Sequence, residues 1–235
     1  GTLTSIRKLD LAKNSMSGKF PVQIKNLKNL EYLNLQHNNI NSELPDIFSS
    51  LASLRHLNLR GNKIYGTLPK SIFTLDKLES LNLVYNELSG QISPSISKLK
   101  NLEYLNLGGN FFDGEIPYQI SSLNRLSVLY LFKNSFRGPI PNELGKMKSL
   151  QKLSLADNRL TGRVPIDLGK IQMKKNFGSI DLSNNLISGT LSNSICSLMS
   201  NSISINLSGN SICGPYPDCI LEVLGYQDTV DCFEN

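Results

Sequence analysis

The sequence contains no tryptophan, only two histidines and no cysteine before position 196. A Gly-x-Gly-x-x-Gly or other phosphate-binding loop is also absent. The two histidines, His37 and His56, are joined by no cysteine nucleophile and no paired acidic cluster, so no catalytic constellation stands out. These absences predict a chain that is not an enzyme and that holds no metal ion or cofactor.

Long hydrophobic runs and a strong charge of one sign are missing as well. No stretch of 18 or more apolar residues occurs, so we expect no membrane span in this chain. Charged residues make up 18% of the chain, and the net charge of +5 comes from scattered lysines rather than from a block. No nucleic-acid-binding motif accompanies that charge, which favours a solvated surface over a nucleic-acid partner.

The sequence does contain one motif, L-x-x-L-x-L-x-x-N-x-L-x-G-x-I/L-P, which is repeated along nearly its whole length. The first seven copies are spaced by 24 residues, and the last two spacings are 27 and 25 residues. Periods of 20–50 residues indicate stacked units that bury their apolar faces only against each other. The pattern predicts an α/β repeat solenoid of the leucine-rich-repeat type, with about nine repeats over residues 1–212. The asparagines of the motif are Asn14, Asn38, Asn62, Asn86, Asn110, Asn134, Asn158, Asn185 and Asn210.

Each position of the repeat has a predicted role. Leu33 and Leu35 alternate with polar neighbours, which indicates a short strand with one buried face, and stacked repeats then form a parallel sheet. Asn38 follows that strand, where its amide can satisfy buried backbone groups of the turn and build a ladder through the stack. A convex segment such as residues 46–51 returns the chain, as a short helical turn.

Glycine and proline mark the next corner of each repeat. The glycines four residues after the asparagines are expected to need a positive φ, with Ser42 as the exception in that column. The proline that follows fixes its own φ and ends the strand ladder on this side of the coil. We place the extra residues of the two long spacings on the convex side, in segments 172–176 and 199–201. The glycines are Gly18, Gly66, Gly90, Gly114, Gly138, Gly162, Gly189 and Gly214.

The L-x-G-x-I-P signature resembles the plant-type leucine-rich repeats, over roughly residues 1–217. That family builds the ectodomains of receptor-like kinases and receptor-like proteins, and the polygalacturonase-inhibiting proteins. The resemblance implies a right-handed superhelix with a concave parallel sheet, a second small sheet near the L-x-G-x-I-P segment, and ligands on the concave or lateral surface. Family N-terminal caps carry a cysteine pair and a tryptophan, so we expect this chain to lack that cap and to be a fragment or a trimmed mature form.

All four cysteines lie in the last 40 residues, in a predicted C-terminal cap over 213–235. Their even number and clustering indicate two disulfides and an oxidising compartment, and three pairings are open on the sequence alone. Zinc is disfavoured because no Cys-x-x-Cys occurs and the histidines lie far away in the sequence. The segment Asn210-Ser-Ile-Cys213-Gly-Pro resembles the start of the cap of the polygalacturonase inhibitors, which implies Cys213–Cys232 and leaves Cys196–Cys219.

The outward positions of the strands form the predicted binding face. Aromatic residues with arginine are enriched at binding hot spots, and they cluster here in repeats two to six, while repeats seven to nine present small side chains. The alternative is a ladder of stacked rings that only supports the sheet. We predict a partner-binding face formed by Tyr32, His37, His56, Arg60, Tyr85, Tyr104, Tyr130, Phe132 and Lys133.

The function predicted from these features is recognition of a protein or peptide ligand, with a possible co-receptor, outside the cell or at its surface. In this interpretation the chain is part of a plant receptor-like protein or receptor kinase ectodomain in signalling or defence. The alternative is a secreted inhibitor of a cell-wall-degrading enzyme, and a remote one is ice binding, which needs a flat regular array. One sequon, Asn206-Leu-Ser, predicts a glycosylation site at Asn206 on the last strand.

Overall fold

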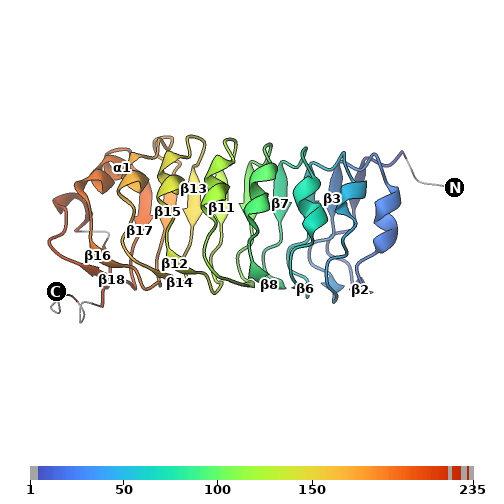
Figure 1. Cartoon of the computed structure of the whole chain (residues 1–235), viewed down its shortest axis with the longest axis horizontal. Coiled ribbons are helices and arrows are strands. Elements are labelled where there is room, and N and C mark those ends of the chain that lie inside the picture. The colour runs from blue at the N-terminus through green and yellow to red at the C-terminus, as the bar shows by residue number, and fades with distance from the viewer. Residues whose placement is uncertain (1–4, 222–223, 229–231, 233–235) are drawn as a thin grey trace.

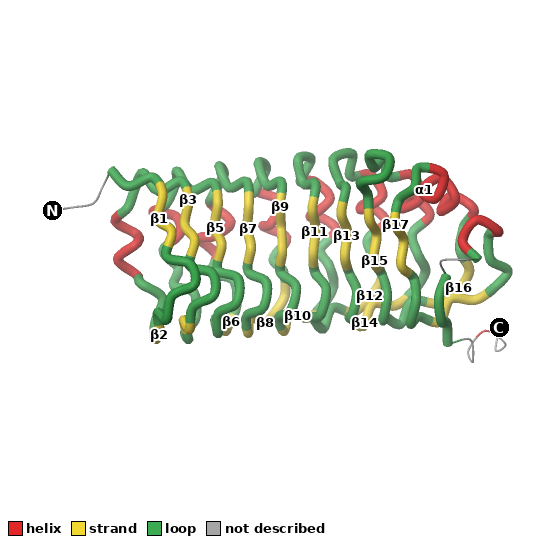
Figure 2. Tube along the Cα trace, turned by 180° about the vertical axis from the view of Figure 1, so that it is seen from behind, coloured by secondary structure: helices red, strands yellow, loops and turns green. Residues whose placement is uncertain are grey.

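The computed structural model describes residues 5–221, 224–228 and 232. Within these residues, nine short strands stack in sequence order into one parallel sheet that runs the length of the molecule (Figures 1 and 2). The fold class predicted from the repeat is therefore confirmed. The strands of this sheet are β1 (Lys8–Asp10), β3 (Tyr32–Asn34), β5 (His56–Asn58), β7 (Ser80–Asn82), β9 (Tyr104–Asn106), β11 (Val128–Tyr130), β13 (Lys152–Ser154), β15 (Ser179–Asp181) and β17 (Ser204–Asn206).

The alternation of leucine and polar residues places one face of this sheet in the core. The central leucine of β3, Leu33, and its register partner Leu57 on β5 are both fully buried. Tyr32 pairs with His56 on the other face, which none of the described helices covers (Figure 2). We call this uncovered surface the open sheet face; it is the concave face expected from the sequence.

The asparagine after each strand forms the predicted ladder. The Nδ2 group of Asn86 donates to the carbonyl oxygens of Leu59 and Leu83, each at 3.0 Å, and its Oδ1 accepts from the backbone N–H of Ile64 at 3.1 Å. Each amide therefore joins its own strand to the preceding repeat. Asn38, Asn62 and Asn110 repeat the same set of bonds.

A second set of strands forms short parallel sheets along one edge of the solenoid, at the bottom of Figure 1. The resemblance to plant-type repeats implied such a sheet, and the structure divides it into four pieces: β2–β4, β6–β8–β10, β12–β14 and β16–β18. These strands are β2 (Ser17–Gly18), β4 (Asn39–Ile40), β6 (Tyr65–Gly66), β8 (Glu87–Gln91), β10 (Phe111–Asp113), β12 (Arg137–Pro139), β14 (Arg159–Thr161), β16 (Ser188–Thr190) and β18 (Ser211–Cys213).

The glycine column of this second sheet behaves as expected in seven of its eight members, which have φ between +71° and +83°. Gly214 is the exception: it has no positive φ, because it precedes Pro215 and the residue before proline is held in extended conformations. Ser42 replaces glycine in the second repeat. Its hydroxyl accepts a hydrogen bond from the N–H of Phe20 at 2.9 Å, so its side chain links two repeats.

The convex side consists of short helical turns, nearly all of the 3₁₀ type. A proline precedes or opens most of them, and each turn buries one or more apolar residues, such as Ile72 of η3 and Leu144 of η6. The turns are η1 (Val22–Asn26), η2 (Phe48–Ser50), η3 (Lys70–Thr74), η4 (Pro94–Lys98), η5 (Tyr118–Ser122), η6 (Asn142–Lys146), η7 (Ile166–Lys170), η8 (Asn193–Ile195), α1 (Cys196–Ser200) and η9 (Asp218–Ile220).

The two longer repeats carry their extra residues on this convex side, as predicted. After η7 the chain makes an additional turn near Asn176, while Met173 reaches into the core with 6% of its surface exposed. The other long repeat extends η8 by the five residues of α1, which is coloured orange near the C-terminal end in Figure 1. Terminal repeats of solenoids are often irregular in this way.

Two disulfides fasten the C-terminal coil, Cys196–Cys219 and Cys213–Cys232, with Cα–Cα separations of 5.6 Å in both. This is the pairing that the resemblance implied. All four thiols are consumed, which removes them as zinc ligands. Part of the predicted cap, residues 222–223, 229–231 and 233–235, lies outside the described residues. Among the helices that are described, none is long and apolar enough to cross a bilayer.

Candidate ligand-binding face

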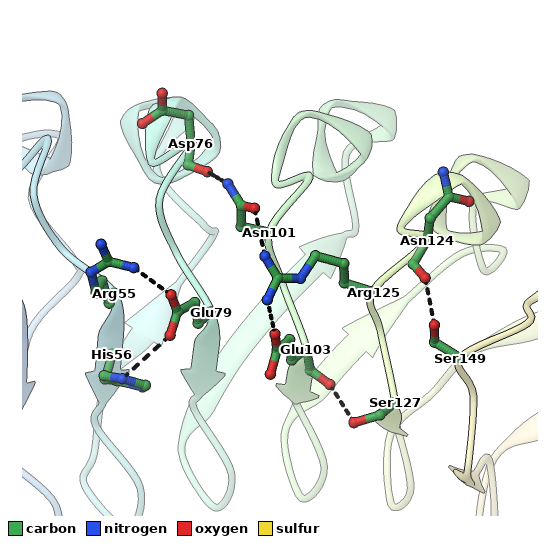
Figure 3. Close-up of polar contacts among 10 residues, drawn as sticks. All are labelled: Arg55, His56, Asp76, Glu79, Asn101, Glu103, Asn124, Arg125, Ser127 and Ser149. Atoms are coloured by element: carbon green, nitrogen blue, oxygen red, sulfur yellow. Dashed lines mark hydrogen bonds and ion pairs between the residues drawn. The ribbon is translucent and has the colours of Figure 1, made fainter.

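The rim of the open sheet face, where the chain enters the strands, carries ion pairs between neighbouring repeats (Figure 3). Arg55 contacts Glu79 at 2.5 Å, and the other carboxylate oxygen of Glu79 lies 3.7 Å from Nε2 of His56. Arg125 pairs in the same way with Glu103. Exposed pairs of this kind contribute about 0–1 kcal/mol each. They fix neighbouring repeats to one another and leave the glutamates little free charge to offer a ligand.

Four of the predicted site residues, Tyr85, Tyr104, Tyr130 and Phe132, form one connected group, which we call the aromatic cluster. Edge-to-face contacts join them in the order Tyr85–Phe132–Tyr130–Tyr104, with ring centroids 6.2, 6.2 and 6.3 Å apart. The guanidinium of Arg60 lies 5.7 Å from the centre of the Tyr85 ring. Tyr104 and Tyr130 lie on strands β9 and β11, and Tyr85 and Phe132 lie in the loops that follow β7 and β11. Arg60, at the edge of the cluster, lies in the loop that follows β5.

Two adjacent glycines make room for this cluster. A Cβ on Gly108 would collide with the ring of Phe132, and a Cβ on Gly109 would collide with the ring of Tyr85. The rings approach from the repeats on either side and lie over the bare backbone of repeat five. Gly108–Gly109 was not among the residues predicted from the sequence. Its signal was present, since the strand of repeat five is followed by two glycines where its neighbours carry side chains.

Burial affects the chemistry of one ring. Desolvation, reinforced by the hydroxyl of Tyr104, raises the pKa of Tyr130 above its ordinary value. Like any tyrosine whose pKa is not lowered, Tyr130 is protonated at neutral pH and can act as a hydrogen-bond donor. The hydroxyl of Tyr104 accepts a hydrogen bond from Nδ2 of Asn106 at 3.0 Å. The cluster is uncharged apart from Arg60 at its edge.

Three predicted site residues share an unusual backbone conformation. His37, Tyr85 and Lys133 have φ of +53°, +57° and +51°. Each immediately precedes a ladder asparagine, a position that Gly61 and Gly109 occupy in other repeats. The left-handed region costs an L-residue roughly 1–2 kcal/mol. The conformation belongs to the repeat, because Lys13, Asp157, Asn184 and Gly209 share it, and a non-glycine residue that accepts this cost is a candidate for a side chain retained for contact rather than for stability.

Lys133→Gly tests this interpretation. We expect the substitution to raise the free energy of unfolding by about 0.5–1 kcal/mol, because relief of the left-handed strain exceeds the added entropy of the unfolded chain. Urea unfolding followed by circular dichroism measures the change. Lys152→Gly, on the extended strand β13, is the control and should lower stability by a similar amount. A loss of stability in Lys133→Gly would show that the lysine has a packing role.

The remaining predicted residues lie apart from the aromatic cluster. Tyr32 and His56 contact each other with ring centroids 5.9 Å apart, and Nζ of Lys8 lies 5.0 Å from the centre of the Tyr32 ring. His37 packs over the backbone of Gly61. The predicted face therefore comprises two groups of rings, one in repeats two and three and the aromatic cluster in repeats four to six.

Beyond the aromatic cluster the open sheet face drops into a hollow of about 410 Å³, which we call the serine hollow. The rings of Tyr130 and Phe132 line one side, and Asp181 and Asn206 line the other. From the sequence, this end of the face was predicted to present only small side chains, and the hollow was not predicted. The hollow arises because a large residue in one strand is followed by small residues in the next three. Its remaining lining residues are Leu153, Ser154, Ser179, Ile180 and Ser204.

Asn206, the predicted glycosylation site, belongs to the wall of this hollow. Its side chain is exposed, and its Oδ1 accepts hydrogen bonds from the N–H and the hydroxyl of Ser208 at 3.2 and 2.8 Å. The Nδ2 atom that would carry a glycan takes no part in those bonds. A glycan at this position would stand in the hollow and would compete with any ligand there.

A larger furrow of about 1130 Å³ runs along the lateral edge, between the second sheet and the 3₁₀ turns of repeats four to eight. It is lined by Pro117, Pro141 and Pro165 of the repeated motif, and by exposed side chains such as Tyr118 and Ile166. The furrow follows from the repeat in its middle part, where Ile116-Pro117, Ile140-Pro141 and Val164-Pro165 recur, while repeats four and eight carry serine in place of the proline. Its arginines and glutamates balance, and it contains no cluster of rings comparable to that of the open sheet face.

Comparisons with known proteins place this architecture. Models of the leucine-rich repeat match residues 4–64 and five further segments, 77–99, 101–123, 125–147, 149–171 and 176–198. A search of curated protein sequences finds no significant match. Similar solved structures include Arabidopsis receptor kinases and a plant peptide hormone receptor.

Three solved structures illustrate the range of proteins to which the chain is similar. The chain is similar to the Arabidopsis thaliana receptor kinase GASSHO1/SCHENGEN3 in complex with CASPARIAN STRIP INTEGRITY FACTOR 2, with 30% identity over 95% of this chain and a TM-score of 0.88. It is similar to the Arabidopsis receptor kinase HAESA in complex with the peptide hormone IDA and the co-receptor SERK1, with 31% identity over 95% of this chain and a TM-score of 0.74. The chain spans 27% and 41% of those two structures. A plant ice-binding protein matches 90% of this chain, which spans 67% of it, with 28% identity and a TM-score of 0.79.

Proposed function

The chain belongs to the leucine-rich-repeat family, and from this premise we propose that it is an extracellular recognition module that binds an extended peptide or protein segment on its open sheet face. The observation that carries the proposal is the aromatic cluster over Gly108–Gly109. Exposed rings that are already held in place lose little side-chain entropy when a ligand covers them.

The alternative, a ring ladder that only stabilises the sheet, explains part of the cluster. Edge-to-face pairs contribute about 0.5–1.5 kcal/mol each beyond the area they bury. It does not explain Tyr85, which keeps 47% of its surface exposed and has a φ that glycine would adopt more readily. A residue retained for stability alone would gain from being glycine here. We therefore assign Tyr85 and the rings it contacts to ligand binding.

The relatives support a peptide ligand. HAESA binds a peptide hormone together with a co-receptor, and this chain is similar to it over nearly its whole length. Since the chain spans less than half of either receptor structure, we propose that it represents part of a longer receptor-like ectodomain, in signalling or defence. Within it we propose a solenoid over residues 1–212 and a cysteine cap over 213–235. The two disulfides support an oxidising, extracellular location.

Ice binding is a second candidate because of the similarity to a plant ice-binding protein. The open sheet face argues against it, since rings project from repeats four to six and the face falls into the serine hollow beside them. A surface with such projections and hollows does not match the flat lattice of ice. A secreted enzyme inhibitor remains the other alternative: it would use the same face, and the disulfide pairing that the structure shows is the one implied by the resemblance to such inhibitors.

Peptide selection tests the proposal. A displayed library of random 12-residue peptides is selected on the chain, and affinities are then measured for a variant with Tyr104→Ala, Tyr130→Ala and Phe132→Ala. We expect at least about a hundredfold loss of affinity, since each hot-spot ring contributes about 1–2 kcal/mol or more.

A matched control removes three exposed rings that lie away from the open sheet face, Tyr65, Tyr118 and Phe177. Its affinity should stay within about twofold of the unmodified chain, because none of these rings belongs to the aromatic cluster. Equal losses in both triple variants, or binding retained by the first, would remove the aromatic cluster as the ligand site.

A further inference from the structure

We propose that the serine hollow binds an arginine side chain of the ligand, with the guanidinium against the rings of Tyr130 and Phe132 and Asp181 as its counter-charge. This inference rests on the proposed function and specifies one residue of the ligand. It assigns a role to the part of the open sheet face that lies between the aromatic cluster and β17 and that contains no ion pair among the described residues.

The register of the sheet sets the dimensions of the site. Tyr130 pairs with Ser154, Ser154 pairs with Asp181, and Asp181 pairs with Asn206, so these four side chains form one row across β11, β13, β15 and β17. Neighbouring strands are about 4.8 Å apart, which separates Tyr130 from Asp181 by roughly 10 Å along the row. Ser154 between them is small. A planar group stacked on the ring of Tyr130 therefore has open space toward the carboxylate.

The charge of Asp181 has no structural task that a neutral residue could not perform. Its Oδ1 accepts hydrogen bonds from the N–H and the hydroxyl of Ser183 at 3.1 and 2.6 Å, which closes the turn after β15. Neutral asparagines close the same turn at the equivalent position of other repeats. These asparagines are Asn34, Asn58, Asn82, Asn106 and Asn206.

No neighbouring cation neutralises this carboxylate within the part of the chain that the structure describes. Among the described residues, the contacts between a basic and an acidic side chain near the open sheet face all lie in repeats one to six. Lys152 stands one strand away with an exposed side chain, and Asp157 is engaged by Nδ2 of Asn184 at 2.7 Å. Asp181 is the acidic residue that lines the hollow, and a cationic group of the ligand would pair with its carboxylate.

Arginine fits this geometry better than lysine. Its flat guanidinium stacks on aromatic faces and presents a fork of N–H donors to a carboxylate, whereas an ammonium group is a compact and strongly hydrated charge. The hydroxyls of Ser154, Ser179 and Ser204, which line the hollow, can accept the remaining donors. The site therefore combines a ring wall, a carboxylate and a polar floor.

The test uses N-acetyl-arginine amide as probe and N-acetyl-citrulline amide as its neutral isostere, titrated into isotopically labelled protein and followed by amide chemical shifts. Ser208→Ala removes the sequon, so that no glycan at Asn206 fills the hollow. We expect the arginine probe to shift the amides of Ser179 and Ser204 and to bind about tenfold more tightly than the citrulline probe. Asp181→Asn should abolish that difference while the protein stays folded.

Asp10→Asn is the matched control, because Asp10 closes the same turn in the first repeat, far from the hollow, by accepting the N–H of Ala12 at 3.1 Å. It should leave both affinities unchanged. Equal binding of the two probes, or no shift at the hollow, would overturn the inference. If selected peptides lose affinity for the aromatic triple variant but not for Asp181→Asn, the proposed function is supported and the arginine site is ruled out.

Discussion

Asn86→Ala is expected to lower the free energy of unfolding by about 2–6 kcal/mol, because one buried backbone donor loses its partner, at about 1–3 kcal/mol, and each of two buried carbonyls loses one of its two hydrogen bonds, at about 0.5–1.5 kcal/mol each. These groups are the carbonyls of Leu59 and Leu83 and the N–H of Ile64, which the amide bonds at 3.0–3.1 Å. Asn86 keeps only 7% of its surface exposed, so water cannot replace the lost bonds.

The control for this prediction lies four residues earlier in the same repeat. Asn82 on β7 faces the open side, and its Oδ1 accepts a single hydrogen bond from the N–H of Val84 at 3.3 Å. Asn82→Ala should cost less than about 1 kcal/mol, because water can reach that group. Urea unfolding followed by far-ultraviolet circular dichroism measures both variants. Similar losses would mean that the asparagine ladder contributes no more than an ordinary surface residue.

The contrast between these two asparagines shows what the sequence makes predictable. The ladder position is an asparagine in every repeat, because one buried side chain must supply both hydrogen-bond donors and a hydrogen-bond acceptor. Leucine, asparagine and the glycine before the motif proline are fixed by the repeat in the same way, and they sufficed to predict the main sheet, the ladder and the positive φ of the glycines, while the second sheet was implied by the resemblance to plant-type repeats.

Other features escape the sequence because no single residue type marks them. The left-handed position before the ladder asparagine holds lysine, histidine, glycine, tyrosine, aspartate or asparagine in different repeats, and only backbone geometry unites them. The serine hollow depends on the size difference between Tyr130 and the small residues of the next strands. The aromatic cluster was partly predictable as exposed rings, but its dependence on Gly108–Gly109 needed the path of the neighbouring chains.

Gly145 illustrates a glycine that the sequence analysis did not single out. It has no positive φ, and it lies in the 3₁₀ turn η6 rather than at the corner before a motif proline. A Cβ at this position would meet the backbone carbon and oxygen of Asp167 in η7 well inside van der Waals contact. The glycine is therefore required by the close approach of two turns.

Gly145→Ala is accordingly expected to lower the free energy of unfolding by about 2–3 kcal/mol, since the clash is with backbone that cannot rotate away and η6 and η7 must separate. Ser121→Ala, at the equivalent position of η5, should cost less than about 1 kcal/mol, because a side chain is already accommodated there and its hydroxyl bonds only the carbonyl of Tyr118 at 2.7 Å. Thermal and urea unfolding compare the two variants. Binding of selected peptides at the open sheet face should be unchanged in folded Gly145→Ala, because the turns lie on the opposite side of the core. A variant as stable as the unmodified chain would show that the turns can move apart freely, and that glycine at this position is not a packing requirement.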